Sequence, residues 1–114
     1  MIAVIFEVEP HPEQGQSYLD IAGDLAPFLD RIDGFISIER FESLSQPRNL
    51  LSLSLWRDEH AVAQWRNEEK HRQAQAAGRS RIFATYRLRI AEVSRDYGLR
   101  ERAQAPKDSL AVHR

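Results

Sequence analysis

The sequence contains no cysteine. Disulfide bonds, thiolate-bound metals and a cysteine nucleophile are therefore excluded for these 114 residues. The sequence also has no run of about 18 apolar residues, which a membrane-spanning helix requires. Its first ten residues, MIAVIFEVEP, have neither the basic start nor the cleavage site of a signal peptide. We therefore expect a cytoplasmic protein that does not insert into a membrane.

The sequence has little excess of either charge, with 16 Lys and Arg residues against 17 Asp and Glu residues. General nucleic-acid binders are normally basic, so we expect no nucleic-acid partner. The GxGxxG, GxxxxGK[ST] and GxSxG signatures are absent, so dinucleotide, phosphate-loop and hydrolase functions lack their local chemistry. No two histidines have HxH or HxxxH spacing, and His60 and His71 are about 16 Å apart along a helix axis. We predict neither a metal site nor a cofactor.

Apolar residues make up 42% of the chain, which is enough for one hydrophobic core. Alternating patterns predict strands over residues 2–8, 50–56 and 82–93, and β-branched and aromatic residues predict a further strand over residues 35–44. Helical spacing predicts one helix over residues 18–32 and a second of about 18 residues between Asp58 and a left-handed cap at Gly78. We therefore expect one domain over residues 1–98. The charged segment 99–114, which contains Pro106, is expected to be a loose tail or an arm around a partner.

The order strand, helix, strand, strand, helix, strand predicts the α+β class. It is typical of a ferredoxin-like βαββαβ fold, an antiparallel sheet with both helices on one face. The opposite face is then uncovered, although Ile5, Ile36, Ile38 and a leucine row in residues 51–55 are expected there. Such a face is too apolar to remain in water. The sequence therefore predicts a homodimer in which a second copy covers it.

The second predicted helix carries most of the side chains that could do chemistry. In a continuous helix, His71 lies roughly 120° around from Trp65, so the two could line a pocket only from its two edges. A functional interpretation makes Trp65 a wall for a flat substrate and His71 a proton acceptor. The alternative makes Trp65 a core residue and His71 a solvated one. Both interpretations stay open on the sequence alone.

Three further charged residues are candidates for substrate contact or catalysis. Glu7 lies on the less apolar face of the first strand, and Arg87 lies with Arg89 on the more polar face of the last. If that face lines a cavity beneath the helices, Arg87 could stabilise a phenolate or enolate oxygen. The alternative is that these are solvated strand residues. Arg72, on the second helix, is a further candidate substrate contact beside Trp65 and Glu7.

The block LWRDEHAVAQWRNEEKHRQAQAAGR, followed by IFATYRLRIAEVSRDYG, resembles the antibiotic-biosynthesis monooxygenase family. Trp56, Asp58, Trp65 and His71 match the family's pattern of a strand-ending tryptophan, an acidic helix start, and a helix-two aromatic with His or Tyr six residues on. With the first strand, the resemblance covers roughly residues 1–98. It implies a dimeric α+β barrel. It also implies oxidation of electron-rich aromatic polyketides or quinols by oxygen, without flavin or metal.

The resemblance further implies that Trp65, His71 and Arg87 supply the aromatic wall, the base and the cationic group. The chain departs from the family in having Ala61 where such enzymes can carry an asparagine. Haem-degrading relatives place a histidine where this chain has Gln75, which argues against haem. We therefore predict a cofactor-independent monooxygenase for a small aromatic or quinol-like compound. The alternative is a non-catalytic dimer that binds a small hydrophobic ligand or serves a stress response.

Overall fold

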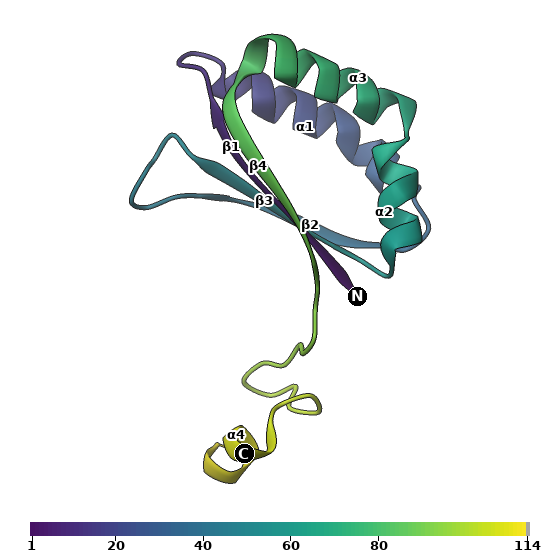
Figure 1. Ribbon diagram of the computed structural model, residues 1–114, viewed down its shortest axis with the longest axis vertical. Helices are drawn as coiled ribbons and strands as arrows, with labels where there is room; N and C mark the ends of the chain where they lie inside the picture. Colours follow the sequence, from purple (N-terminus) through teal and green to yellow (C-terminus); the bar gives the residue numbers. More distant parts are fainter. Residues whose placement is uncertain (114) are drawn as a thin grey trace.

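The computed structural model describes residues 1–113 and contains one four-stranded antiparallel sheet (Figure 1). Its strands are β1 (Ile2–Pro10), β2 (Phe35–Glu42), β3 (Leu50–Trp56) and β4 (Phe83–Glu92), in the order β2-β3-β1-β4. The helices α1 (Gly15–Leu29), α2 (Glu59–Arg66) and α3 (Glu69–Ala77) lie on one face of the sheet. This arrangement confirms the predicted α+β, ferredoxin-like fold.

The segment predicted as one second helix is two helices, and this prediction was wrong. Asn67 ends α2, and Glu68 has an extended backbone (φ −67°, ψ 132°) before α3 begins. The side chain of Glu68 accepts a hydrogen bond from the backbone N–H of His71 at 2.9 Å and so caps the new helix. The chain therefore turns between Trp65 and His71, and helical spacing does not apply across the turn.

Gly78 is not the left-handed cap that the sequence predicted. Its φ is −59°, and the chain continues through a π-helical turn, Gly78–Ile82, into β4. A Cβ atom at this position would lie 2.3 Å from Cε2 of Phe83. The glycine is therefore explained by the close approach of an aromatic ring and not by backbone conformation.

The register of the sheet decides which side chains face the helices. Because side chains alternate along a strand, one set lies beneath the helices and the other on the open face. The helix side carries Val4, Phe6, Ile38, Ser52, Ser54, Trp56, Tyr86, Leu88 and Ile90. The leucine row and Ile5 lie on the open face, as predicted. Ile38 does not, because an irregularity between Phe35 and Ser37 shifts the alternation of β2.

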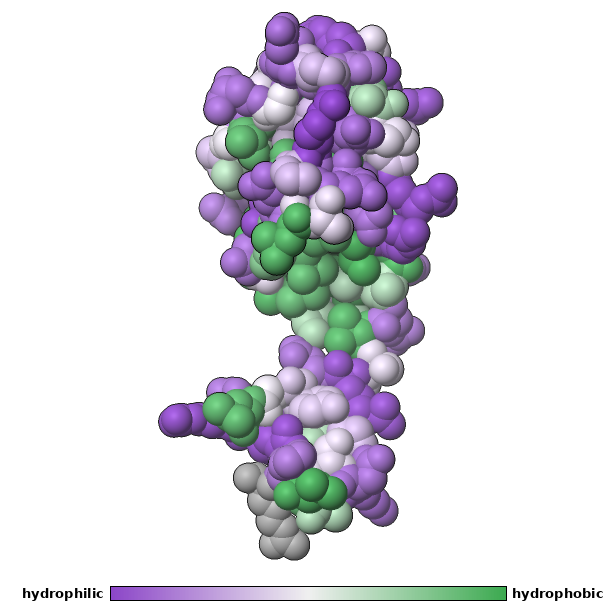
Figure 2. All heavy atoms as spheres, turned by 90° about the vertical axis from the view of Figure 1, so that its left-hand side faces the viewer, coloured by the Kyte–Doolittle hydropathy of each residue, from purple (hydrophilic) through white to green (hydrophobic). Residues whose placement is uncertain are grey.

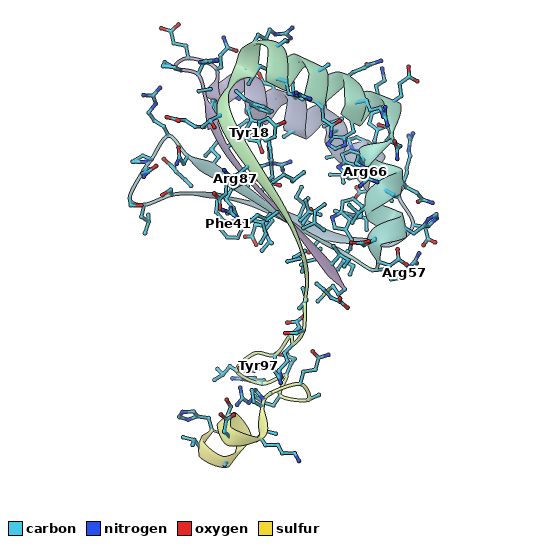
Figure 3. The ribbon with its side chains drawn as sticks, in the orientation of Figure 1. Tyr18, Phe41, Arg57, Arg66, Arg87 and Tyr97 are labelled. Carbon is cyan, nitrogen blue, oxygen red and sulfur yellow. The ribbon has the colours of Figure 1, made fainter. Side chains whose placement is uncertain are left out.

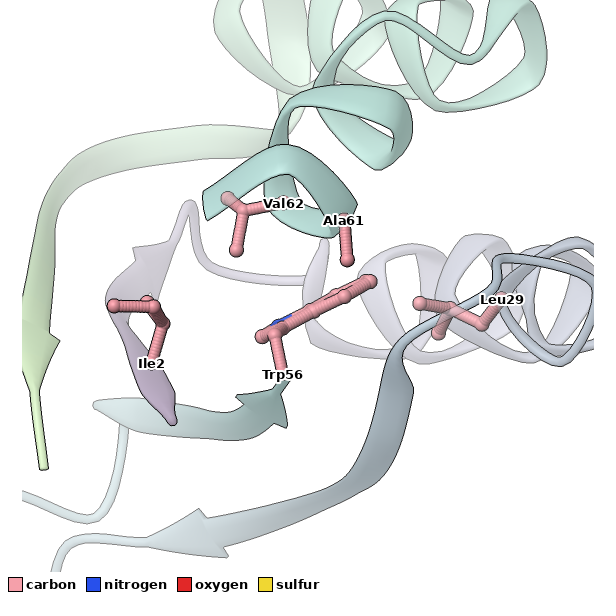
Figure 4. Close-up of a cluster of buried hydrophobic side chains, with 5 residues drawn as sticks. All are labelled: Ile2, Leu29, Trp56, Ala61 and Val62. Carbon is pink, nitrogen blue, oxygen red and sulfur yellow. The ribbon is translucent and has the colours of Figure 1, made fainter. Parts of the chain in front are cut away.

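Two clusters of buried side chains hold the helices to the sheet. One consists of Ile2, Leu29, Trp56, Ala61 and Val62, and it fixes α2 and the end of α1 against β1 and β3 (Figure 4). The other consists of Val8, Tyr18 and Ile82, with Phe6 and Phe83 packed against it. The clusters lie at opposite ends of the layer between helices and sheet, so the middle of that layer is supported from both ends.

The open face of the sheet is apolar in its centre. Figure 2 views the molecule from this side and shows hydrophobic side chains gathered in the lower half of the globular part. Leu51, Leu53 and Leu55 of β3 are only half-buried here, and Ile36 and Phe41 of β2 are exposed. The face also carries an ion pair, in which Arg89 donates to Glu7 at 3.0 Å.

The segment after β4 leads away from the sheet and ends in a short helix, α4 (Lys107–Val112) (Figure 1). Within it, the Arg102 guanidinium donates to the carbonyls of Gly98 and His113. Its interpretation as a tail or an arm stays a prediction. None of the helices described in residues 1–113 is both long and apolar enough to cross a membrane. The cytoplasmic location also stays a prediction.

Candidate active-site cavity

A cavity of about 330 Å³ lies between the helices and the sheet, and we refer to it as the central cavity. Its volume falls within the range of small-molecule sites. Most of its lining is aliphatic or aromatic, contributed by α1, by the helix side of the sheet and by α2 and α3. The apolar lining includes Val4, Phe6, Tyr18, Ile21, Leu25, Ile38, Trp56, Trp65, Leu88 and Ile90. Such a lining excludes water from the body of a bound ligand.

Trp65 and His71 both line the central cavity, and their rings stack on each other. The ring centroids are 4.3 Å apart and the planes differ by 14°. The prediction from the sequence placed these residues at two edges of a pocket, because it treated residues 65–71 as part of one unbroken helix. The turn at Glu68 removes that constraint and brings the imidazole onto the indole. Trp65 in turn stacks at 6.5 Å on Trp56, so the three rings form a continuous wall from the core into the cavity.

The hydrogen bonds of His71 decide which of its ring nitrogens is free. Nδ1 lies 3.0 Å from the backbone carbonyl oxygen of Trp65. A carbonyl oxygen only accepts, so Nδ1 carries the proton and donates to it. The neutral ring then has an unprotonated Nε2 that is available as a proton acceptor. The backbone cap from Glu68 to the N–H of His71 fixes the other end of the same residue.

Burial lowers the pKa of His71 from its ordinary value of 6.5. The Trp65 carbonyl and the charge of Glu68 oppose this shift, because both favour the protonated ring, but desolvation is the largest influence. The imidazole is therefore neutral near pH 7. A neutral imidazole with a free Nε2 in an apolar cavity is suited to act as a general base.

Ser52 and Ser54 of β3 are buried beneath the helices and line the floor of the central cavity. The Ser54 hydroxyl accepts a hydrogen bond from Nε1 of Trp56 at 2.8 Å, which satisfies the buried indole. Sequence reasoning missed both serines, since the alternation of β3 does not show which face meets the helices. Trp56 was the available signal for the face that meets the helices, because it lies on the same face of β3 as the two serines.

Three arginines that sequence reasoning did not select also line the central cavity. They are Arg40 of β2, Arg66 at the end of α2 and Arg79 just after α3. All three are exposed, so they lie where the cavity meets solvent. No motif marks them, because they come from three different elements and meet only in the fold.

Glu7, Arg87 and Arg72 are not among the residues that line the central cavity, so the structure does not bring these three candidates together with Trp65 and His71. Glu7 pairs with Arg87 in the sheet register, and both alternate with residues on the helix side, so they lie on the open face. Figure 3 shows Arg87 and Tyr18 on opposite sides of the sheet. Arg72 donates to the side chain of Asn67, at the turn between the helices.

The chemistry of the cavity lining does not resemble a metal centre. Within residues 1–113, no group of three or more His, Cys, Asp or Glu side chains is placed to hold a metal ion. Gln75 lines the cavity, at the position where the family resemblance would lead one to look for a haem-ligating histidine. An amide side chain is not a ligand that haem iron uses.

Comparisons with known proteins agree with this architecture. The family model for antibiotic biosynthesis monooxygenase matches residues 1–77. A curated relative, the jasmonate monooxygenase ABM of Pyricularia oryzae, is 48% identical over 94 residues, which are 82% of this chain and 44% of that protein. The chain thus spans less than half the length of this relative.

Solved structures share the fold at low sequence identity. A protein of Deinococcus radiodurans that is proposed to be an antibiotic biosynthesis monooxygenase is 17% identical with a TM-score of 0.76, covering 86% of this chain and 97% of that one. The cofactor-independent oxygenase SnoaB of Streptomyces nogalater, as its N63A mutant, is 13% identical with a TM-score of 0.72, covering 83% and 94%. The predicted family is confirmed by the family model and the curated relative: the chain belongs to the antibiotic biosynthesis monooxygenase family.

Proposed function

We propose that the protein is a monooxygenase that oxidises a small, largely apolar molecule in the central cavity, with His71 as the general base. The observation that carries the proposal is the state of His71. Its Nδ1 is occupied by the Trp65 carbonyl, its ring is stacked on the Trp65 indole, and burial keeps it neutral. A base in this state is ready to take a proton from a bound substrate at Nε2.

The reaction we propose first is oxidation of an anthrone-like or quinol-like aromatic compound. Removal of a proton by Nε2 makes the substrate anion electron-rich enough to reduce oxygen. A methylene group that becomes a carbonyl supplies four electrons, and one oxygen molecule accepts them, giving the new C=O and one water. The substrate then supplies every electron, and the protein supplies an apolar pocket and a proton acceptor.

A second candidate substrate is jasmonate or a compound like it, because the 48%-identical relative is named a jasmonate monooxygenase. This molecule has no electron-rich aromatic ring. Hydroxylating one of its C–H bonds with oxygen uses two more electrons and two protons, with the second oxygen atom leaving as water. The two candidates therefore differ in whether an added reductant is needed.

Oxygen consumption tests both candidates. Dithranol, an anthrone, should be consumed with one oxygen molecule per substrate molecule and no added reductant, whereas jasmonate should need NADPH or ascorbate. His71→Gln should lower the rate by about 10²-fold or more, which is the usual contribution of a general base. His60→Gln is the matched control, because His60 lies on α2, is exposed and does not line the cavity.

Two results would contradict the proposal. One is an unchanged rate in the His71 variant. The other is the absence of oxygen consumption with both substrates and with hydroquinones, under conditions in which the protein binds them. Binding without turnover would instead favour a non-catalytic ligand-binding protein that uses the same cavity.

We also infer that a second copy of the chain covers the open face of the sheet. Half-buried leucines and Ile5 make this face apolar in a single chain (Figure 2). A contiguous apolar surface of this kind is stabilised by association. Leu53→Asp should therefore yield monomers in sedimentation velocity, while Leu19→Asp, which alters an exposed leucine on α1, should leave the dimer intact. A monomeric wild-type protein would contradict the inference.

A further inference from the structure

The charged residues around the central cavity all have the same sign. Arg40, Arg66 and Arg79 line it, and none of the aspartates and glutamates in the described residues 1–113 does. The whole chain has a formal net charge of −1, so this cationic lining is not a property of the average surface. An apolar cavity with cationic groups at its mouth favours a ligand that is anionic at one end and apolar elsewhere.

These three arginines have no acidic partner within the described residues 1–113. The ion pairs found there join Arg57 to Asp33 and Asp58, and Arg89 to Glu7. The remaining arginine side-chain hydrogen bonds in that range belong to Arg72 and Arg102. The guanidinium groups at the cavity are thus not held by a carboxylate of the described chain and can meet a ligand.

Arg66 is the arginine best placed to meet a ligand that also reaches His71. It follows Trp65 in the last turn of α2, so it is attached directly to the aromatic wall of the cavity. Figure 3 shows Arg66 toward the space between the helices and the sheet, whereas Arg57 lies at the outer corner of the molecule. Arg40 and Arg79 approach the same cavity from β2 and from the end of α3.

We propose that the central cavity binds an apolar carboxylic acid, with the carboxylate held by the guanidinium of Arg66 and the apolar body against Trp65 and the sheet floor. This names the substrate class of the proposed monooxygenase and rests on that function. The planar guanidinium suits a carboxylate, because it donates two parallel hydrogen bonds. Arg40 and Arg79 add positive potential at the mouth. The neutral His71 carries no charge that would compete with Arg66 for the carboxylate.

The arrangement also separates two tasks on the ligand. Arg66 fixes the charged end, so the apolar end is directed along the wall formed by Trp65 and His71. A neutral analogue of the same shape would keep the apolar contacts and lose only the charged anchor. Binding of such a pair therefore measures the contribution of the anchor by itself.

The test compares 1-naphthaleneacetate with 1-naphthaleneacetamide by isothermal titration calorimetry at low ionic strength. The two probes have nearly the same shape and differ in charge. The wild-type protein should bind the acid about tenfold more tightly than the amide, a difference of about 1.4 kcal/mol. Arg66→Gln should abolish the preference, and Arg66→Lys should keep part of it. Arg48→Gln, in the loop between β2 and β3, removes the same charge away from the cavity and should keep all of it.

Equal affinities of acid and amide for the wild-type protein would overturn the proposal. A full preference for the acid in Arg66→Gln would also overturn it, as would no binding of the acid at concentrations up to about 1 mM. A melting temperature and circular dichroism spectrum like those of the wild type show that each variant is folded. Neither probe has to be oxidised. Carboxylate recognition can therefore fail while oxygen consumption with a neutral anthrone stands, and it can hold while oxygen consumption fails.

Discussion

The turn between α2 and α3 places His71 on Trp65, and Glu68 caps the helix that begins there. The contribution of this cap to the free energy of unfolding should be measurable. Glu68→Ala removes the acceptor for the backbone N–H of His71, which lies 2.9 Å away. Glu69→Ala is a matched control, because it removes the same charge from the neighbouring residue, the first of α3. The two changes affect the helix dipole alike, and only the first removes a hydrogen bond.

Loss of a side-chain cap costs about 1 kcal/mol of stability, which corresponds to about 4 °C in melting temperature for a domain of this size. Glu68→Ala should therefore have a lower free energy of unfolding than Glu69→Ala by about 1 kcal/mol, and so unfold at a lower urea concentration. Tryptophan fluorescence is a suitable signal, because Trp56 and Trp65 stack beside the turn. Both variants should be compared at one protein concentration, since association would alter the midpoint.

Glu68→Ala should also change the pKa of His71, the proposed base. The Glu68 charge raises the pKa of His71 against desolvation, so its removal should lower that pKa further. Equal urea midpoints for Glu68→Ala and Glu69→Ala, with equal His71 titrations, would refute the view that Glu68 builds the turn and positions the imidazole.

Three other predictions concern packing, a buried hydrogen bond and pH. Gly78→Ala should lower the free energy of unfolding by about 1–3 kcal/mol, because the new Cβ atom would lie 2.3 Å from an aromatic carbon of Phe83. In the same urea experiment Gly23→Ala should raise the free energy of unfolding by about 0.5–1 kcal/mol, because no atom lies within 4 Å of a Cβ there. Ser54→Ala should lower the free energy of unfolding by about 1–3 kcal/mol, because the buried Nε1 of Trp56 loses its acceptor; an unchanged urea midpoint would contradict this. Burial lowers the pKa of His71, so the unfolded chain takes up a proton on this residue before the folded protein does as the pH falls through 6.5. The free energy of unfolding of the wild type should therefore decrease below that pH, and His71→Gln should show a smaller decrease.

The four strands were predictable, three from the alternation of side chains along them and the one over residues 35–44 from its β-branched and aromatic residues. Leu50–Trp56 was predicted with its observed bounds, and Tyr86, Leu88 and Ile90 form the apolar face of β4 as expected. The pattern did not show how a local irregularity shifts a face, which is why Ile38 was assigned to the wrong side. A bulge leaves no distinct residue signature in β2.

The candidate site was predicted in part for a similar reason. Trp65 and His71 were selected from their residue types, but their stacking depends on the break that Glu68 makes in the helix. Periodicity alone cannot detect it, since residues on both sides keep helical spacing. The alternation of β1 did hold information about Glu7, because Val4 and Phe6 mark the helix side and Glu7 is out of phase with them. Arg66 had no local signal at all.

The protonation state of His71 is the central claim, and nitrogen NMR measures it directly. Long-range ¹H–¹⁵N correlation spectra of histidine-labelled protein should be recorded between about pH 4.5 and 8. We predict that His71 carries its proton on Nδ1 at neutral pH, with Nε2 unprotonated, and titrates below 6.5. A proton on Nε2 in the neutral ring, or a titration midpoint above 6.5, would contradict the account.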